Sequence, residues 1–183
     1  MTTTTRIDPL FFGSGPRVFE MFLEPTCPFS GRALGKVDAF LAEAGQAKVT
    51  VKLRLQSQPW HMYSPVVTRC VLAASTLAGG RHDARKLLEI IAAHREEFEF
   101  ESHCKGPNMD VTPREIIRRL EGYSGLALAE AFELRELEAE VKRHARYARQ
   151  NGIHVSPTFM VDGLVDPKLG SGDDVKDWAK VFA

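Results

Sequence analysis

Hydrophobic residues along the chain follow strand and helix periods in turn. Behind a leader rich in glycine and proline, the segment Arg17–Leu23 is almost continuously apolar and has strand length, which predicts a buried strand. From Phe29 to Ala44 the apolar residues recur at helical spacing, and Gly45 follows them. This spacing predicts one amphipathic helix of about four turns that ends at the glycine.

The next segment, residues 48–56, alternates apolar and polar residues. Its valines and leucines are separated by Thr50, Lys52 and Arg54, and this period of two predicts a strand with one polar face. A strand, a helix and a second strand in close succession indicate a right-handed parallel βαβ unit.

The middle of the chain, residues 64–151, carries helical spacing and no strand pattern. Thr112, Pro113 and Glu115 form a capping-box pattern that predicts the start of one of its helices. Helices are expected to stop at three places, which are Gly79-Gly80, the loop 102–110 and the segment 122–125. We therefore expect an all-helical block.

Strand chemistry returns after Asn151-Gly152. Residues 158–161 read as a strand, and Asp162-Gly163 is a hairpin signal. A last helix is expected behind Asp174, with Trp178 on its apolar face. The predicted fold class is α/β, with a helical insertion between a βαβ half and a ββα half.

Composition narrows the class of protein. The 183 residues include 24 Lys plus Arg and 24 Asp plus Glu, so the formal charge is zero and a nucleic-acid partner is not expected. The apolar runs are too short to cross a bilayer, and no membrane partner is expected. The opening residues lack the apolar run of a secretory signal, so a chain that starts naturally at Met1 is expected to be cytoplasmic. Three cysteines are too few for a disulfide scaffold.

The sharpest chemical feature is Cys27-Pro28-Phe29-Ser30, at the junction between the first strand and its helix. Unpaired backbone N–H groups and the positive end of a helix favour a thiolate at this place. Pro28 suits the first helical turn, where its missing N–H costs nothing. Ser30 can offer a hydroxyl group to the sulfur but cannot form a disulfide with it.

The sequence resembles the DsbA-like branch of the thioredoxin fold. The resemblance rests on three features in this order: the cysteine motif, the helical block and the downstream run that contains Ser156-Pro157-Thr158. The resemblance extends from about residue 17 to residue 181. It implies a thioredoxin-like domain formed by residues 1–63 and 152–183, interrupted by a helical insertion over residues 64–151. It also implies that Cys27 is the nucleophile.

Two further roles follow from the resemblance. Pro157 is expected to be a cis proline beside Cys27, and the backbone of Ser156 is expected to face a bound peptide or thiol. The sequence departs from the family pattern at Ser30, which replaces the second cysteine, so a mixed disulfide on Cys27 has to wait for an outside thiol. Phe29 stands where the strongest oxidants of the family have an activating histidine.

The loop after the second strand adds Trp60 and His61. Parallel strands end at the same edge of a sheet, so this loop should lie near Cys27, where both side chains can line the site or supply a proton. The simpler interpretation, which we favour at this stage, has Trp60 covering the junction of the two lobes and His61 solvated.

The other candidates favour structural roles. Cys70 lies among apolar residues at helical spacing and is expected in the core. Cys104, beside His103, is a resolving thiol or metal ligand in one interpretation and an incidental surface cysteine in the favoured one. The cysteines and histidines lack a zinc-ligand spacing, so no metal site is predicted.

These observations favour a cytoplasmic monothiol oxidoreductase. In this hypothesis Cys27 and Ser30 are catalytic, and six residues contact the substrate: Pro28, Phe29, Trp60, His61, Ser156 and Pro157. No tightly bound cofactor is expected, and glutathione is a candidate co-substrate that releases Cys27. Two alternatives stay open: a glutathione-dependent transferase or isomerase of the same fold, and a redox-inactive peptide-binding module.

Overall fold

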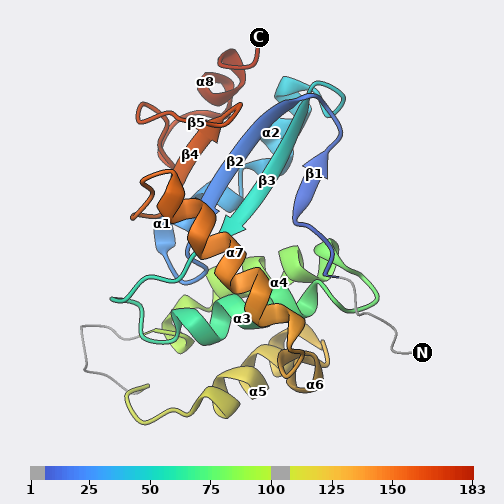
Figure 1. The fold of residues 1–183 in the computed structure, drawn as a ribbon, viewed down its shortest axis with the longest axis vertical. Coiled ribbons are helices and arrows are strands. Elements are labelled where there is room, and N and C mark those ends of the chain that lie inside the picture. Colours follow the sequence, from blue (N-terminus) through green and yellow to red (C-terminus); the bar gives the residue numbers. More distant parts are fainter. Residues whose placement is uncertain (1–6, 100–107) are drawn as a thin grey trace.

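A mixed five-stranded sheet forms the centre of the structure (Figure 1). The structure is a computed structural model that describes residues 7–99 and 108–183. Its strands, in chain order, are β1 (Phe11–Gly13), β2 (Arg17–Leu23), β3 (Val49–Leu55), β4 (Thr158–Val161) and β5 (Leu164–Val165). The spatial order is β1-β3-β2-β4-β5, in which β2 pairs in parallel with β3 and antiparallel with β4. The predicted parallel unit is confirmed, whereas β1 was not predicted.

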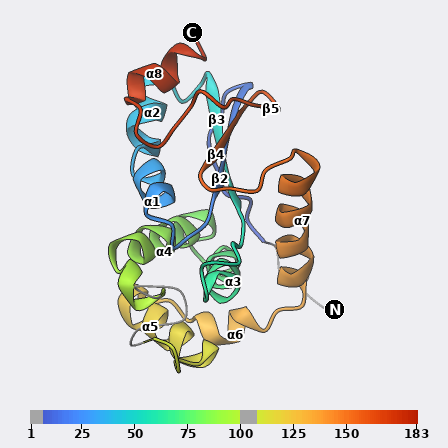
Figure 2. The ribbon, with the colours of Figure 1, turned by 90° about the vertical axis from the view of Figure 1, so that its left-hand side faces the viewer.

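Helices cover both faces of this sheet and form a lobe at one end of it (Figure 2). One face carries α1 (Pro28–Leu34), α2 (Val37–Ala44) and α8 (Val175–Lys180), and the other carries α7 (Glu136–Gln150). The lobe contains α3 (Ser64–Ala74), α4 (Arg81–Ala93), the short 3₁₀ helix η1 (Arg95–Glu97), α5 (Pro113–Ser124) and α6 (Leu128–Phe132). The described part of the middle block is therefore helical, as predicted, although the expected stop at 102–110 falls largely outside the described residues.

Local signals at two element ends behave as the sequence predicts. At the start of α5, Glu115 N–H donates to the Thr112 hydroxyl group and the Glu115 carboxylate accepts from Thr112 N–H, which completes the capping box. Between β4 and β5, Asp162 and Gly163 both have positive φ, of 48° and 87°, which is the conformation of a type I′ hairpin turn.

The single helix predicted over residues 29–44 is wrong, because α1 and α2 are separate helices. Gly35 keeps a helical φ of −62°, so glycine flexibility does not cause the break. The break lies at Lys36, whose N–H donates to Ala33 O in a tight turn and whose ammonium group donates to the Ser171 and Asp173 carbonyls at 2.7 and 2.5 Å. This tertiary anchor packs α2 onto the α8 region.

An aromatic cluster holds these helices on the sheet. The Phe19 ring, on β2, has its centroid 4.9 to 5.6 Å from the rings of four other residues, which are Phe40, Phe159, Trp178 and Phe182. Trp178 and Phe19 are both fully buried. Burying aromatic side chains of this size contributes strongly to the stability of a core. The cluster therefore fixes β2, α2, β4 and α8 relative to one another.

The opposite face of the sheet carries the polar residues of β3, as predicted, with Thr50 and Lys52 half-buried and Arg54 buried. Arg54 is only 8% exposed because α7 covers it. Its guanidinium group forms an ion pair with Glu20 at 2.6 Å and lies 4.9 Å from the centroid of the Tyr147 ring. The Tyr147 hydroxyl group donates to the same Glu20 carboxylate at 2.8 Å. This buried network attaches α7 to β2 and β3.

His144 provides a second attachment of α7 to the sheet. Its Nδ1 accepts a hydrogen bond from Leu55 N–H at 2.9 Å, and its Nε2 lies 3.1 Å from Glu140 Oε1. The ring is therefore neutral, with a proton on Nε2 and none on Nδ1. Burial lowers the pKa of His144, in agreement with this geometry.

Replacing His144 should change how stability depends on pH. Because the folded pKa of His144 lies below its unfolded value, the unfolded state binds more protons in mild acid, so stability is lost as the pH falls through the unfolded value. Between about pH 7.5 and pH 5.5 this loss should reach about 1 kcal/mol. His144→Asn keeps an acceptor for Leu55 N–H without the titration, so its unfolding free energy should fall less over this range.

The comparison is made by chemical denaturation of both proteins at each pH. Other titrating groups, such as Glu24, are present in both proteins. Their contributions to the pH dependence of the unfolding free energy cancel when the wild type and the variant are compared. Equal pH slopes for the wild type and His144→Asn would contradict the assignment of His144 as a buried neutral acceptor.

Candidate functional site

Cys27 lies at the end of the sheet where β2 gives way to α1. Its N–H donates to Glu24 O at 3.1 Å, and its carbonyl accepts from Gly31 N–H in the first turn of α1. The residue is 6% exposed. Because the helix breaks after Leu34, Cys27 precedes a helix of only seven residues instead of the four-turn helix expected from the sequence.

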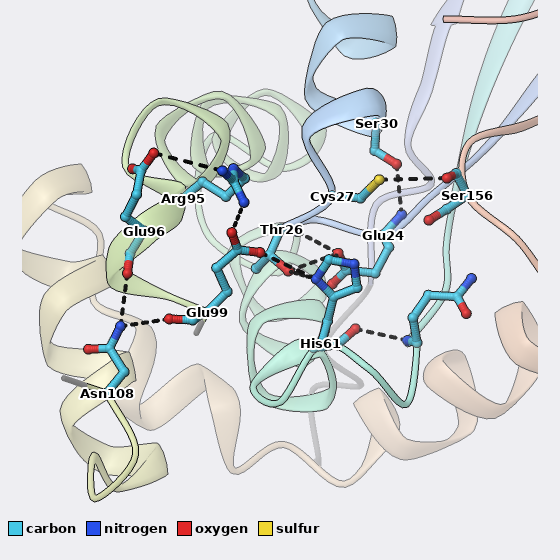
Figure 3. Close-up of polar contacts among 12 residues, drawn as sticks. Glu24, Thr26, Cys27, Ser30, His61, Arg95, Glu96, Glu99, Asn108 and Ser156 are labelled. Carbon is cyan, nitrogen blue, oxygen red and sulfur yellow. Dashed lines mark hydrogen bonds and ion pairs between the residues drawn. The ribbon is translucent and has the colours of Figure 1, made fainter. Parts of the chain in front are cut away.

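The second motif meets Cys27 across 129 positions of sequence, as Figure 3 shows. The Cys27 Sγ donates to the carbonyl oxygen of Ser156 at 3.6 Å. The Ser156-Pro157 peptide bond is cis. Strand pairing explains the meeting: Phe22, near the end of β2, pairs with Thr158, the first residue of β4, so the loop before β4 lies beside the loop after β2. The two predicted halves of the site are thus brought together.

The other residues of the first motif divide between the interior and the surface. Ser30 is buried, and its hydroxyl oxygen accepts from Glu24 N–H at 3.2 Å. The hydroxyl group therefore holds the turn between β2 and α1, and its role toward the sulfur stays a prediction, because a hydroxyl group that accepts one hydrogen bond keeps its own proton to donate. Pro28 and Phe29 are exposed, with the Phe29 side chain at 53%, and the Arg32 guanidinium group lies 5.6 Å from the Phe29 ring centroid.

His61 is not solvated, so the simpler interpretation of this residue is wrong. Its side chain is only 14% exposed. The Nδ1 atom lies 3.0 Å from Thr26 Oγ1, 3.4 Å from Glu99 Oε2 and 3.6 Å from Glu24 Oε2 (Figure 3). These oxygens come from the β2–α1 turn and from the segment after η1, so His61 joins the sheet edge to the helical lobe. The Glu99 carboxylate is itself paired with Arg95.

Glu24 is a site residue that sequence reasoning missed. Its side chain is fully buried, and its Oε2 accepts from both the N–H and the hydroxyl group of Thr26 at 2.9 Å. Burial raises the pKa of the Glu24 carboxyl group, although hydrogen bonds from Ser64, Thr26 and the Cys27 backbone oppose the shift. The only signal in the sequence was a glutamate directly after a buried strand and three positions before the cysteine.

Trp60 lies at the surface, where it lines a cavity of about 360 Å³ between its own loop and α7. The side chain is 51% exposed, and its expected role as a cover over the junction of the two lobes stays a prediction. The same loop is tied to the proline loop by Gln56, whose Nε2 donates to Val155 O at 2.8 Å. The residues after β3 and the residues before Pro157 therefore form one continuous edge.

Exposed apolar side chains gather on the segments that surround Cys27. They lie on the start of α1, on the loop after β3 and on the loop before β4. The residues are Phe29 at 53%, Trp60 at 51%, Met62 at 47% and Val155 at 61% exposed. Exposed apolar side chains mark a binding surface when they form a contiguous patch, whereas single ones are common on any protein. We refer to these four residues as the apolar rim.

The remaining candidates have no part in this site. Cys70 is fully buried, and burial raises the pKa of its thiol to about 12, which confirms its place in the core. Cys104 and His103 lie outside the described residues. Within residues 7–99 and 108–183, no group of three or more His, Cys, Asp or Glu side chains is placed to hold a metal ion. No helix in that part of the chain combines the length and apolar character needed to cross a bilayer.

The fold matches known structures. No family model and no curated sequence matches the chain. A candidate protein-disulfide isomerase from Pseudomonas syringae has a similar structure with a TM-score of 0.94 and 61% sequence identity, over 96% of this chain and 98% of that one. DsbA2 from Pseudomonas aeruginosa matches with a TM-score of 0.67 at 17% identity, over 96% and 93% of the two chains. The DsbA oxidoreductase from Xylella fastidiosa matches with a TM-score of 0.62 at 22% identity, over 96% of this chain and 85% of that one.

The contrast between Cys27 and Cys70 predicts selective alkylation. The thiolate is the nucleophile, so a buried thiol with a pKa of about 12 should stay unmodified near neutral pH. Iodoacetamide at about pH 7.5 should modify Cys27 and leave Cys70 untouched in the folded protein. Peptide mass spectrometry locates the label, and Cys27→Ala is the matched control. Labelling of Cys70 at the same rate as Cys27 would contradict the account.

Proposed function

Because the chain belongs to the DsbA-like family of thioredoxin-fold thiol-disulfide oxidoreductases, we propose that it catalyses thiol–disulfide exchange through Cys27 alone. One observation carries the proposal: the Cys27 Sγ lies 3.6 Å from the Ser156 carbonyl oxygen, beside Pro157, while a serine occupies position 30. The first feature places the sulfur against the backbone of the proline loop. The second removes an internal resolving thiol.

The exchange takes place in two balanced steps. The Cys27 thiolate attacks one sulfur of a substrate disulfide, a new disulfide to Cys27 forms, and the other substrate sulfur leaves as a thiolate that takes up a proton. Ser30 has no sulfur with which to attack the new bond. A second thiol therefore attacks the mixed disulfide, forms its own disulfide with the substrate sulfur and returns Cys27 as a thiolate.

Glutathione is the small thiol that suits the second step. Reduced glutathione releases Cys27 from a mixed disulfide, and a glutathionylated protein is a substrate whose glutathionyl group can pass to Cys27. An exchange that depends on an outside thiol is best served in the cytosol, where such thiols stay reduced and abundant. Glutathione acts here as a co-substrate and not as a resident cofactor.

The surroundings of Cys27 favour a peptide or protein substrate. The Ser156 backbone faces the sulfur, and Pro28 and Phe29 on one side and Pro157 on the other border it. The apolar rim adds contact surface for apolar side chains near the substrate cysteine. His61 lies in the polar part of the same edge, through its contact with Thr26.

Removing the Cys27 sulfur should abolish exchange. Cys27→Ala is expected to bring the rate of deglutathionylation of a glutathionylated peptide down to the uncatalysed background, because no other described thiol is placed to attack. Cys70→Ala, which removes a buried thiol, is the matched control and should keep the wild-type rate. Retained exchange in Cys27→Ala would refute the proposal, and retained peptide binding without exchange would favour the binding-module alternative.

Restoring a second cysteine should change the order of the reaction. Ser30→Cys places a thiol one helical turn from Cys27, so the mixed disulfide can be resolved within the protein. Release of a peptide from Cys27 should then become independent of glutathione, whereas in the wild type it should rise in proportion to glutathione concentration. Quenched-flow measurements of the release rate over a range of glutathione concentrations distinguish these two behaviours. Glutathione-independent release in the wild type would contradict the single-thiol mechanism.

A further inference from the structure

The cavity beside Trp60 is separate from the place where the Cys27 sulfur meets the Ser156 carbonyl. The helix α7 contacts both β3 and α3 (Figure 1), and the cavity of about 360 Å³ lies between α7, α3 and the loop after β3. We call it the α7 cavity. Neither Cys27 nor Ser156 lines it, and most of its wall is apolar, with Trp60, Val141 and Ile153 among the lining residues.

Two buried polar side chains in this wall lack a hydrogen-bond partner. Gln58, from the loop after β3, and Thr68, on α3, both line the cavity and are only 3% and 2% exposed. In the described structure, neither the Gln58 Nε2 atom nor the Thr68 Oγ1 atom has a partner. Buried polar groups in folded proteins nearly always have one, because leaving such a group without a partner costs stability. The pair therefore indicates that a molecule from outside the chain supplies the missing partner.

An organic molecule suits this cavity better than water alone. An ordered water molecule is typically held by about three hydrogen bonds, and a mostly apolar wall offers few groups to make them. The last torsion of a glutamine side chain is soft, so the Gln58 amide can turn toward an oxygen atom in the cavity. A molecule with an apolar body and one such oxygen would bury apolar surface and supply the missing acceptor together.

The charge at the cavity favours an acid. Arg149, at the end of α7, and His154, in the loop before β4, both line the cavity and are exposed, so they stand at its mouth. No ion-pair partner of Arg149 occurs within the described part of the chain. The described lining residues include no carboxylate. An arginine that is not neutralised is a good partner for a carboxylate.

We propose that the α7 cavity binds a small organic acid. The carboxylate of the ligand pairs with Arg149 beside His154 at the exposed mouth, and its apolar body packs against Trp60. An oxygen atom at its inner end accepts a hydrogen bond from Gln58 and contacts the Thr68 hydroxyl group. Binding of this acid does not involve the Cys27 sulfur, so the proposal does not depend on the exchange reaction proposed above.

Three compounds of similar size test the chemistry of the ligand. Phloretate has a carboxylate, an aromatic ring and a phenolic oxygen at the far end. Hydrocinnamate lacks the phenolic oxygen, and tyramine carries an ammonium group in place of the carboxylate. Isothermal titration calorimetry should give a dissociation constant below about 1 mM for phloretate, a size-limited affinity for a compound of about a dozen non-hydrogen atoms. Hydrocinnamate should bind about fivefold more weakly, and tyramine should not bind measurably.

Two variants test the inner end of the cavity. Thr68→Val and Gln58→Met keep the approximate size of the side chain and remove the polar atom that lacks a partner. Because no hydrogen bond within the protein is lost, both variants should unfold at the wild-type temperature or above it. Their affinity for phloretate should nevertheless fall by about fivefold, whereas their affinity for hydrocinnamate should equal that of the wild type. A residue with only a structural role would not change binding of one compound and spare the other.

The mouth of the cavity is tested by Arg149→Gln. This variant should bind both phloretate and hydrocinnamate about fivefold more weakly than the wild type, since both compounds carry the carboxylate. Arg146→Gln removes an exposed arginine of α7 that does not line the cavity, and it is the matched control. Trp60 fluorescence locates the ligand: phloretate should change the emission of the wild type but not of Trp60→Phe, in which the fully buried Trp178 is the remaining tryptophan.

Each of several results would overturn the proposal. They are no binding of phloretate to the wild type, tyramine binding as tightly as phloretate, and equal loss of affinity in Arg149→Gln and Arg146→Gln. Unchanged phloretate affinity in both Thr68→Val and Gln58→Met would overturn it as well. Phloretate binding that depends on its carboxylate, on Arg149 and on the two buried polar side chains supports it.

Discussion

The central position of β2 is the constraint on which the site depends. Because β2 pairs in parallel with β3 and antiparallel with β4, the end of β2, the end of β3 and the start of β4 lie at one edge of the sheet. Cys27, the Trp60-His61 loop and the Ser156-Pro157 loop follow or precede these three strand ends. Residues 129 positions apart in the chain are thereby placed within 3.6 Å of each other. Loss of the β2–β4 pairing would separate the sulfur from the carbonyl that faces it.

The sheet keeps this arrangement because both of its faces are covered. The aromatic cluster around Phe19 holds α2 and α8 on one face, and the Glu20–Arg54 ion pair with Tyr147 holds α7 on the other. A buried ion pair stabilises a fold only when its charges are well hydrogen-bonded, and here the Tyr147 hydroxyl group supplies an additional donor to Glu20. Packing on both faces leaves the strand ends as the place where backbone and side chains are free for chemistry.

Periodicity and local signals predicted most of the elements, and tertiary contacts account for what they missed. The strands Arg17–Leu23 and Thr158–Val161, the capping box at Thr112 and the Asp162-Gly163 turn are encoded by neighbouring residues. The break lies at Lys36, whose side chain bonds carbonyl groups more than a hundred positions away, and no local pattern reveals this contact. Cys27 and Pro157 were identified by resemblance to a family. Glu24 and the half-buried state of His61 required the fold, because their environment comes from separate segments.

A single reactive thiol beside a facing carbonyl is the central claim, and it implies that the protein stops halfway through exchange when no second thiol is present. The most direct test is the intact mass of the wild-type protein after incubation with oxidised glutathione and removal of the excess reagent. The account predicts one glutathionyl group, located on Cys27, that persists until a reducing thiol is added. A protein that carries no such group, or carries it only on another cysteine, would contradict the account.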